Sequence, residues 1–88
     1  MMKHININIS GAVQGVGFRF SAYEKFVELG VQGKAENTND GGVLIDAEGQ
    51  EDKLEQLIDW SRRGPAGARV ENAQIIELKD PFVPLKSS

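Results

Sequence analysis

The sequence contains no cysteine and only one histidine among its 88 residues. Without cysteine the chain forms neither disulfides nor thiolate metal sites, so its fold must be held by an apolar core. A chain without thiols suits the cytoplasm, and we expect a cytoplasmic protein. The N-terminal residues alternate between apolar and polar side chains. This pattern predicts neither a signal peptide nor a membrane span.

Positive charge is also scarce, since 10 Lys and Arg stand against 13 Asp and Glu and the formal net charge is −3. Affinity for nucleic acids comes from clustered cations that displace counterions, so we do not expect a nucleic-acid partner. A small anionic ligand is compatible with this net charge, because a local nest of backbone N–H groups attracts an anion more strongly than the weak field of the whole protein repels it.

The length predicts one domain over residues 1–88. A chain of this size buries roughly 60–65% of its unfolded surface around a single core. We expect a monomer. Apolar periodicity predicts six elements in the order β-α-β-β-α-β. They cover residues 5–10, 21–29, 32–37, 43–48, 51–63 and 70–78.

Local signals refine these elements. Ser21 and Glu24 form a potential capping box for the first helix, and Gly30 provides its stop. The cluster at residues 38–42 predicts a hairpin turn, and a slip in the apolar phase predicts a bulge around Asn72. His4 opens the first strand, and we expect it at the surface or at a sheet edge.

The element order predicts an α+β fold, a ferredoxin-like βαββαβ sandwich in which two helices cover one face of an antiparallel sheet. A right-handed crossover makes the first two strands parallel, with another strand between them. The loop after the first strand and the end of the second therefore lie at one edge of the sheet, ~10 Å apart at the backbone.

A glycine-spaced loop, GAVQGVGFR at residues 11–19, connects the first strand to the first helix. Glycines let successive N–H groups converge on an anion, and arginine adds a permanent bidentate charge. Such a loop alone is more often only a tight connection. It lacks the P-loop Lys and the third glycine of a dinucleotide fingerprint. The candidate phosphate-binding residues are Gln14, Gly15, Val16, Gly17, Phe18 and Arg19.

Asn37 ends the second strand and is the candidate partner of Arg19 across the gap. Its amide can orient a water for in-line attack at phosphorus, although a strand-end asparagine more often satisfies backbone groups. Asparagine is a poor general base, so the substrate needs a good leaving group. An acyl phosphate has one, because it releases a carboxylate. This chemistry requires no metal and no cofactor.

The run at residues 11–19 resembles the signature of the acylphosphatases, and GKAEN at residues 33–37, with the Asp40-Gly41 turn, is similar to their second motif. The resemblance covers about residues 5–78. It implies a ferredoxin-like fold and metal-independent hydrolysis of the carboxyl-phosphate bond of small acyl phosphates. It also implies that Arg19 binds the phosphate, that Asn37 orients the water and that Thr38 has a supporting role.

The chain departs from the family pattern at Lys34, where an aromatic is usual, and at Glu36, where a basic or neutral residue is usual. Strand alternation turns both side chains away from the Asn37 face. Residues 79–88 diverge as well, because the family's aromatic-rich edge strand is replaced by a segment containing Pro84. The last strand should therefore be short, displaced or absent.

Two other functions use the same fold. An RNA-binding sheet needs aromatic and basic residues on its central strands, and residues 43–47 carry neither. A catalytically weak anion-binding or regulatory module, similar to the acylphosphatase-like segment inside larger carbamoyl-transferring maturation proteins, would bind phosphate without turnover. Measuring saturable hydrolysis separates it from the enzyme.

Overall fold

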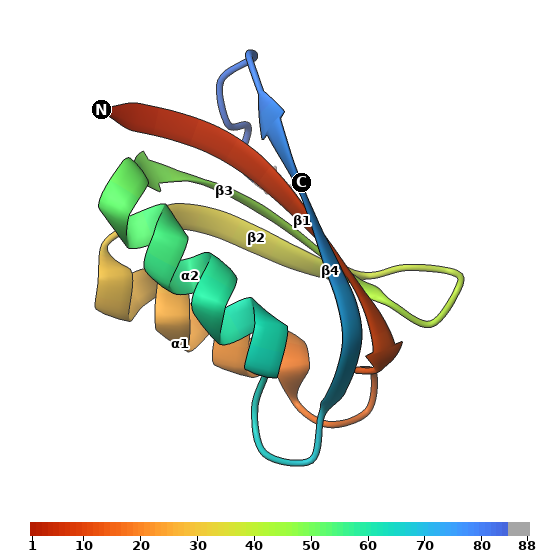
Figure 1. Ribbon diagram of the computed structural model, residues 1–88. Helices are drawn as coiled ribbons and strands as arrows, with labels where there is room; N and C mark the ends of the chain where they lie inside the picture. Colours follow the sequence, from red (N-terminus) through yellow and green to blue (C-terminus); the bar gives the residue numbers. More distant parts are fainter. Residues whose placement is uncertain (85–88) are drawn as a thin grey trace.

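The computed structural model describes residues 1–84 and contains four strands and two helices in the predicted order (Figure 1). The elements are β1 (Met2–Ala12), α1 (Phe18–Leu29), β2 (Gln32–Asn37), β3 (Val43–Gln50), α2 (Glu51–Arg63) and β4 (Arg69–Leu78). Neighbouring strands are antiparallel in the order β2-β3-β1-β4, and both helices cover one face. The ferredoxin-like fold is confirmed. Within residues 1–84, neither helix has the length and apolar character needed to cross a membrane.

Strand β1 occupies the centre of the sheet. Its Ile9 pairs with Val43 of β3 on one side and with Ala73 of β4 on the other. Because β1 and β2 are each antiparallel to β3, they run in the same direction, as the crossover rule predicts. The loop after β1 and the end of β2 are thereby brought to the same edge of the sheet.

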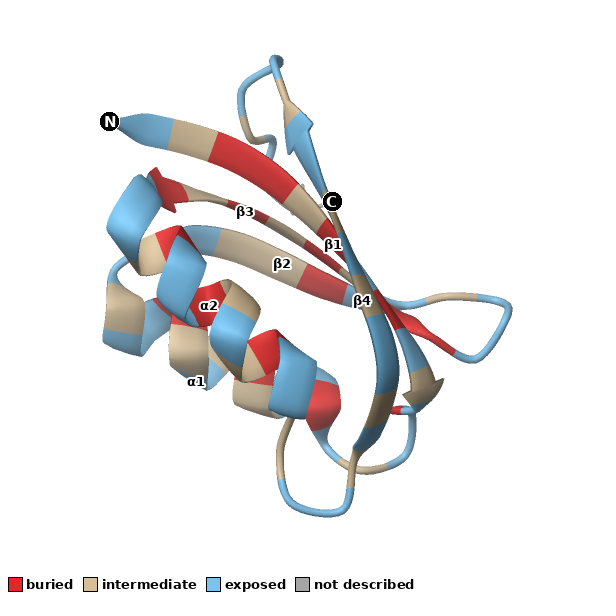
Figure 2. Ribbon diagram, viewed as in Figure 1, coloured by how far each residue is buried: buried red, intermediate tan, exposed pale blue. Residues whose placement is uncertain are grey.

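The core lies between the sheet and the helices (Figure 2). Alternate residues of β1 and β3 face the helices, and the cross-strand pair Ile7 and Ile45 is fully buried. Each such side chain contributes about 1.5–3 kcal/mol relative to an exposed one. The helices supply Phe18, Ala22, Phe26, Leu54 and Leu57.

Strands β1 and β4 meet at a bulge close to the predicted position. Ser10 pairs with Asn72 and Gly11 with Val70, so Glu71 is the extra residue. Gly11 has φ +124°, and a Cβ there would lie 2.1 Å from the carbonyl oxygen of Arg69. Glycine is therefore required for this close approach of the two strands.

Helix α1 begins three residues earlier than the sequence predicted. Its N-cap is Gly17, in the left-handed conformation at φ 76°, and no side chain caps the helix. The predicted capping box of Ser21 and Glu24 is therefore wrong. Burial of Phe18 extends the apolar stripe by one turn, so packing overrides the local capping signal. Gly30 ends the helix at φ 70°, as predicted.

The expectation for His4 is wrong, because this residue lies in the central strand and is buried. The C-terminal segment, residues 79–84, turns back over the sheet face that the helices leave open and forms no strand. The His4 ring donates hydrogen bonds to the carbonyl of Asp80 and the carboxylate of Asp46. The Phe82 ring meets it edge-on at 6.0 Å. The remaining residues of the divergent segment, 85–88, lie outside the described part of the chain.

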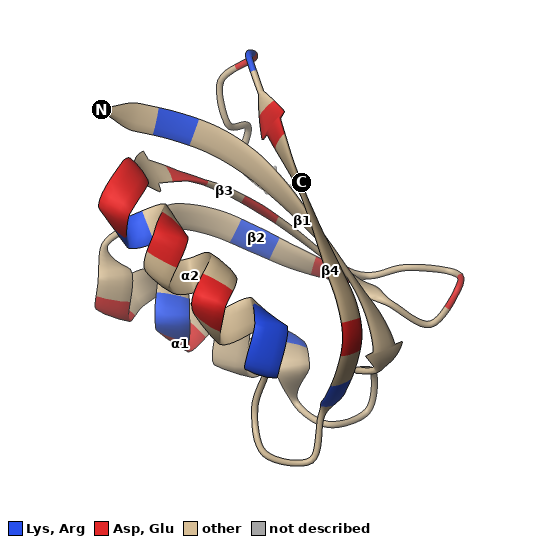
Figure 3. Cartoon of the chain, in the orientation of Figure 1, with Lys and Arg blue, Asp and Glu red and all other residues tan. Residues whose placement is uncertain are grey.

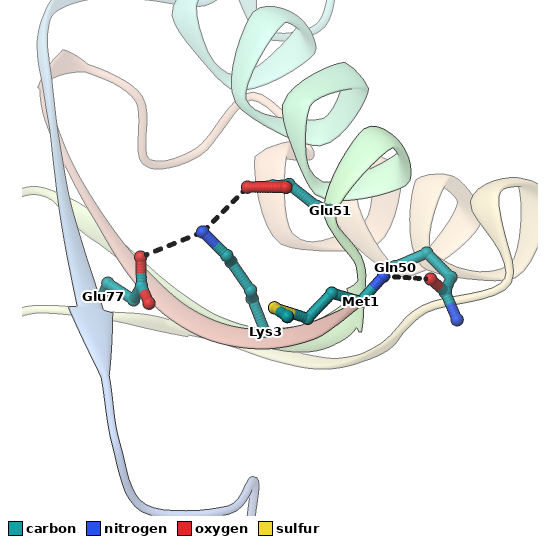
Figure 4. A network of polar contacts seen from close by, with 5 residues as sticks. All are labelled: Met1, Lys3, Gln50, Glu51 and Glu77. Carbon is teal, nitrogen blue, oxygen red and sulfur yellow. Dashed lines mark hydrogen bonds and ion pairs between the residues drawn. The ribbon is translucent and has the colours of Figure 1, made fainter.

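Polar contacts tie the N-terminal end of β1 to its neighbours (Figure 4). The ammonium of Lys3 lies 2.7 Å from Glu51 at the start of α2 and 3.5 Å from Glu77 on β4. The N-terminal amine donates to Gln50 Oε1 at 3.0 Å. All of these contacts lie at the end of β1 opposite the glycine loop.

Candidate active site

Arg19 and Asn37 line the same cavity, as the predicted topology requires. The cavity has a volume of about 200 Å³. That is below the ~300–1,000 Å³ of sites for drug-sized ligands, so it suits a small group. Its lining comes from the loop after β1, the first turn of α1 and the end of β2. The lining residues are Val13, Gly15, Gly17, Phe18, Arg19, Phe20 and Asn37.

The loop takes its shape from Gly15 and Gly17, which have φ 77° and 76°. Only glycine adopts such angles without strain. A Cβ at either position would meet no atom within 4 Å, so the requirement is conformational rather than steric. Both glycines line the cavity, and successive residues in such turns can form a nest whose backbone N–H groups bind an anion.

The first turn of α1 adds further donors. The first helical hydrogen bond runs from the N–H of Ser21 to the carbonyl of Gly17, at 3.0 Å. The N–H groups of residues 18–20 therefore have no acceptor within the helix and point out of its N-terminal end. No acidic side chain lies in this turn, so the positive end of the helix dipole is not neutralised locally.

Arg19 is exposed, and among residues 1–84 it forms no ion pair. A second source of positive charge lies nearby in the last turn of α2, which holds Arg62 and Arg63 (Figure 3). The end of α2 is close to the site, because a Cβ at Gly64 would lie 2.7 Å from the Phe18 ring. The end of the molecule that carries the loop is thus locally basic despite the net charge of −3.

Gln14 connects the two halves of the site. Its side-chain amide donates to the carbonyls of Thr38 and Gly42, at 2.9 and 2.8 Å. These bonds fasten the glycine loop to the hairpin turn that follows Asn37. Gln14 and Val16 do not line the cavity, and Val16 packs against the core instead. Of the predicted phosphate-binding set, Gly15, Gly17, Phe18 and Arg19 do line it.

Thr38 organises the turn rather than the cavity. Its hydroxyl donates to the carboxylate of Asp40 and accepts the N–H of Gly42 at 3.0 Å. The Thr38 hydroxyl, with the Gly42 N–H, holds the pKa of Asp40 below its usual value. The negative charge of Asp40 is therefore engaged within the turn next to Asn37.

Sequence reasoning did not assign two of the lining residues to the site. Val13 is fully buried and forms the floor between loop and core. Phe20 is 71% exposed and stands at the rim. Its signal in the sequence was weak but present, since Phe20 follows Arg19 and does not fall on the apolar stripe of Ala22 and Phe26.

Larger hollows, of about 330 and 520 Å³, lie along the two helices. They are lined by long side chains of both signs, among them Lys25, Glu28, Asp59 and Arg63, around the half-buried Trp60. Mixed charges on an open helical surface do not converge on one ligand group. The small cavity beside the loop instead combines the glycine loop with Arg19 and Asn37.

The chain is similar to known proteins over most of its length. The family model described as "Acylphosphatase" matches residues 5–82. A protein from Caldanaerobacter subterraneus subsp. tengcongensis named "Acylphosphatase" is 45% identical over 74 residues, covering 84% of this chain and 82% of the relative. The structure of an acylphosphatase from Coxiella burnetii superposes with a TM-score of 0.88 at 34% identity, covering 93% of this chain and 86% of that one.

A larger protein contains a similar part. The crystal structure of full-length HypF in its phosphate- and nucleotide-bound form matches with a TM-score of 0.82 at 29% identity. The match covers 89% of this chain but 10% of the HypF chain. The same fold therefore occurs both as a chain of this size and as a small part of a longer one.

Proposed function

The chain belongs to the acylphosphatase family, and we propose that it hydrolyses the carboxyl-phosphate bond of acyl phosphates without a metal ion. The products are a carboxylate and inorganic phosphate. The observation that carries this proposal is the shared lining of one cavity by the glycine loop, Arg19 and Asn37. Hydrolysis at phosphorus depends mainly on positioning and on stabilising charge, and this lining offers both.

The phosphoryl group is held on the loop side of the cavity. Its non-bridging oxygens accept hydrogen bonds from the backbone N–H groups of residues 15–19 and from the guanidinium of Arg19. The free ion-pairing capacity of Arg19 and the unneutralised end of α1 support this role. Negative charge that spreads over these oxygens in the transition state is stabilised by donors already in place.

The attacking water is held on the opposite side by Asn37. The side-chain oxygen of Asn37 accepts a hydrogen bond from the water, which leaves a lone pair of the water directed at phosphorus. Gln14 supports this geometry indirectly, because its bonds to Thr38 and Gly42 fix the distance between the loop and the hairpin. Thr38 has a supporting role, because its hydrogen bonds to Asp40 and Gly42 fix the turn to which Gln14 is bound.

The reaction proceeds in one displacement. The water oxygen forms a bond to phosphorus while the bond from phosphorus to the acyl oxygen breaks, and the acyl group departs as a carboxylate. Among the lining residues there is no carboxylate or imidazole to act as a general base. The proton of the water is instead accepted by a phosphate oxygen, which suffices because the leaving group is good.

The decisive measurement is hydrolysis of benzoyl phosphate by the purified protein, with and without EDTA, with Arg19→Ala as the control. Turnover that survives EDTA and collapses in the variant supports metal-independent hydrolysis at this loop. Phosphate binding without turnover would instead identify a catalytically weak anion-binding module on the same fold, which also occurs as a small part of HypF. Turnover that EDTA abolishes would contradict the mechanism.

A further inference from the structure

We infer that Phe20 is the platform for the acyl group and that the enzyme prefers acyl phosphates with an apolar, aromatic acyl part. This inference rests on the proposed function and adds a substrate class to it. Phe20 is 71% exposed and lines the cavity beside Arg19 and Asn37. It is the only aromatic side chain among residues 1–84 that is exposed, since the other five are buried or half-buried.

The position of Phe20 in α1 directs its ring toward the loop. It is the third residue of the helix, and side chains in a helix lean toward its N-terminus. The N-terminus of α1 is the end that faces the cavity. The ring therefore stands at the rim, over the exit that the acyl part of a bound substrate must take.

The rest of the lining leaves this exit without polar groups. Arg19 and the backbone N–H groups are committed to the phosphoryl oxygens, and Asn37 to the water. The remaining side chains are Val13, Phe18 and Phe20, all apolar. A charged or polar acyl group would gain no partner from these side chains, whereas a phenyl ring would bury apolar surface against Phe20.

Phe20 has no visible role in holding the fold. It belongs neither to the core cluster nor to the half-buried side chains packed on it. Val27 provides a matched control, because it lies seven residues further along α1 on the same helical face and is 83% exposed, but does not line the cavity. Truncating either side chain should leave the folded structure intact.

The test compares benzoyl phosphate with acetyl phosphate in the wild type, Phe20→Ala, Phe20→Tyr and Val27→Ala. We expect Phe20→Ala to lower kcat/KM for benzoyl phosphate about fivefold, through KM, and to change acetyl phosphate by less than twofold, since an aromatic contact is worth about this factor. Phe20→Tyr and Val27→Ala should keep the wild-type ratio of the two substrates. An unchanged ratio in Phe20→Ala, or an equal loss in Val27→Ala, would overturn the inference.

A binding measurement separates this inference from the proposed function. Phenylphosphonate and methylphosphonate carry the same charged group with an aromatic or a methyl substituent, and neither is hydrolysed by attack on an acyl-phosphate bond. We expect the wild type to bind phenylphosphonate more tightly and Phe20→Ala to lose this preference. If both substrates are hydrolysed but the wild type shows no such preference, the role of Phe20 is contradicted and the proposed function stands. If neither substrate is hydrolysed, the proposed function is contradicted, and the inferred substrate class with it.

Discussion

The basic groups at the two ends of β1 have opposite environments. At the N-terminal end, the His4 ring is buried, and each of its nitrogens donates to an oxygen, one on Asp46 and one on Asp80. Past the C-terminal end, the guanidinium of Arg19 is exposed and forms no ion pair within residues 1–84. A basic group whose partners lie within the chain is already engaged, whereas a charge left without a partner beside a cavity is available to a ligand.

The same contrast extends to backbone groups. Around His4, carboxylates and a carbonyl surround the ring, and the Glu48 carboxylate accepts the N–H of Phe82 at 3.4 Å. Around Arg19, the free N–H groups of the first turn of α1 have no acceptor within the helix. At one end of the strand the polar groups are partnered within the chain, and at the other the donors of the first turn of α1 have no acceptor within the helix.

The largest effect is expected when the unpartnered charge of Arg19 is removed. Arg19→Ala should lower kcat/KM by at least ~100-fold, because a charge-assisted clamp in the transition state is worth about 3 kcal/mol. The melting temperature should not change, since Arg19 forms no ion pair among residues 1–84. Steady-state kinetics and thermal melts measure the two effects. Arg62→Ala is the matched control, and retention of most activity in Arg19→Ala would refute the role of Arg19.

The second change removes the amide across the cavity. Asn37→Ala should lower kcat roughly 10- to 100-fold, because a misplaced water costs about this much in rate. Inhibition by inorganic phosphate should weaken far less, since the loop and Arg19 remain. The measurement is kcat together with the phosphate inhibition constant for each variant. A large loss of phosphate affinity with little change in kcat would make Asn37 a binding residue instead.

The third change breaks the other end of β1. His4→Gln should lower the free energy of unfolding by about 2 kcal/mol, the value of hydrogen bonds to a charged group, with kcat/KM unchanged. Burial lowers the pKa of His4, but its hydrogen bonds to Asp80 and Asp46 and the charges of Asp46 and Glu48 outweigh burial and raise it above 6.5.

The sign of the pH effect follows from this raised pKa. When the pKa of a group is higher in the folded state, its protonation stabilises the fold. This contribution to the free energy of unfolding is complete below the pKa of the unfolded state, here about 6.5, and is lost as the pH rises through the pKa of the folded state. Denaturant unfolding of wild type and His4→Gln from pH 5 upward should therefore show a difference that is largest below ~6.5 and shrinks at higher pH. A difference in the free energy of unfolding that grows with pH would contradict a stabilising role for the protonated His4 ring.

The smallest effect is expected at Glu36, near the active-site end of the sheet. Glu36 precedes Asn37 but lies on the opposite face of β2, at an exposed position. Glu36→Gln should lower KM modestly, by about 1.5-fold at low salt, because one repulsive charge near the anion is removed and salt screens the rest. Kinetics at two ionic strengths measure it, with Glu55→Gln on α2 as the distant control. An unchanged KM at low salt removes any influence of Glu36.

Much of the fold could be predicted because its signals are local. The bounds of β2 and α2 agree with the sequence prediction, since a hairpin cluster and strong end signals flank them. The start of α1 could not be placed by capping rules, because burial of Phe18 and the turn at Gly17 decide it. The stripe of Phe18, Ala22 and Phe26, read together, would have indicated the earlier start.

The environment of His4 was missed for a different reason. Nothing in the sequence indicates that this residue is buried, because no local pattern shows that residues 79–84 return to the sheet face on which His4 lies. Its partners lie 42 and 76 residues away along the chain. At the candidate site, Arg19 and Asn37 followed from motif and topology, while the bridging role of Gln14 depended on carbonyl positions that only the structure provides.

The central place of β1 has a consequence for how the chain folds during synthesis. This strand is made before β3 and β4, yet its Ile9 pairs with Val43 of β3 and with Ala73 of β4. The apolar residues of β1 therefore have no strand partners until β3 and β4 have been made. Contacts between residues so far apart in the sequence also form slowly. Since the glycine loop is attached to β1, we expect phosphate-binding competence to arise only after β4 has been made, so that incomplete chains carry the motif without its function.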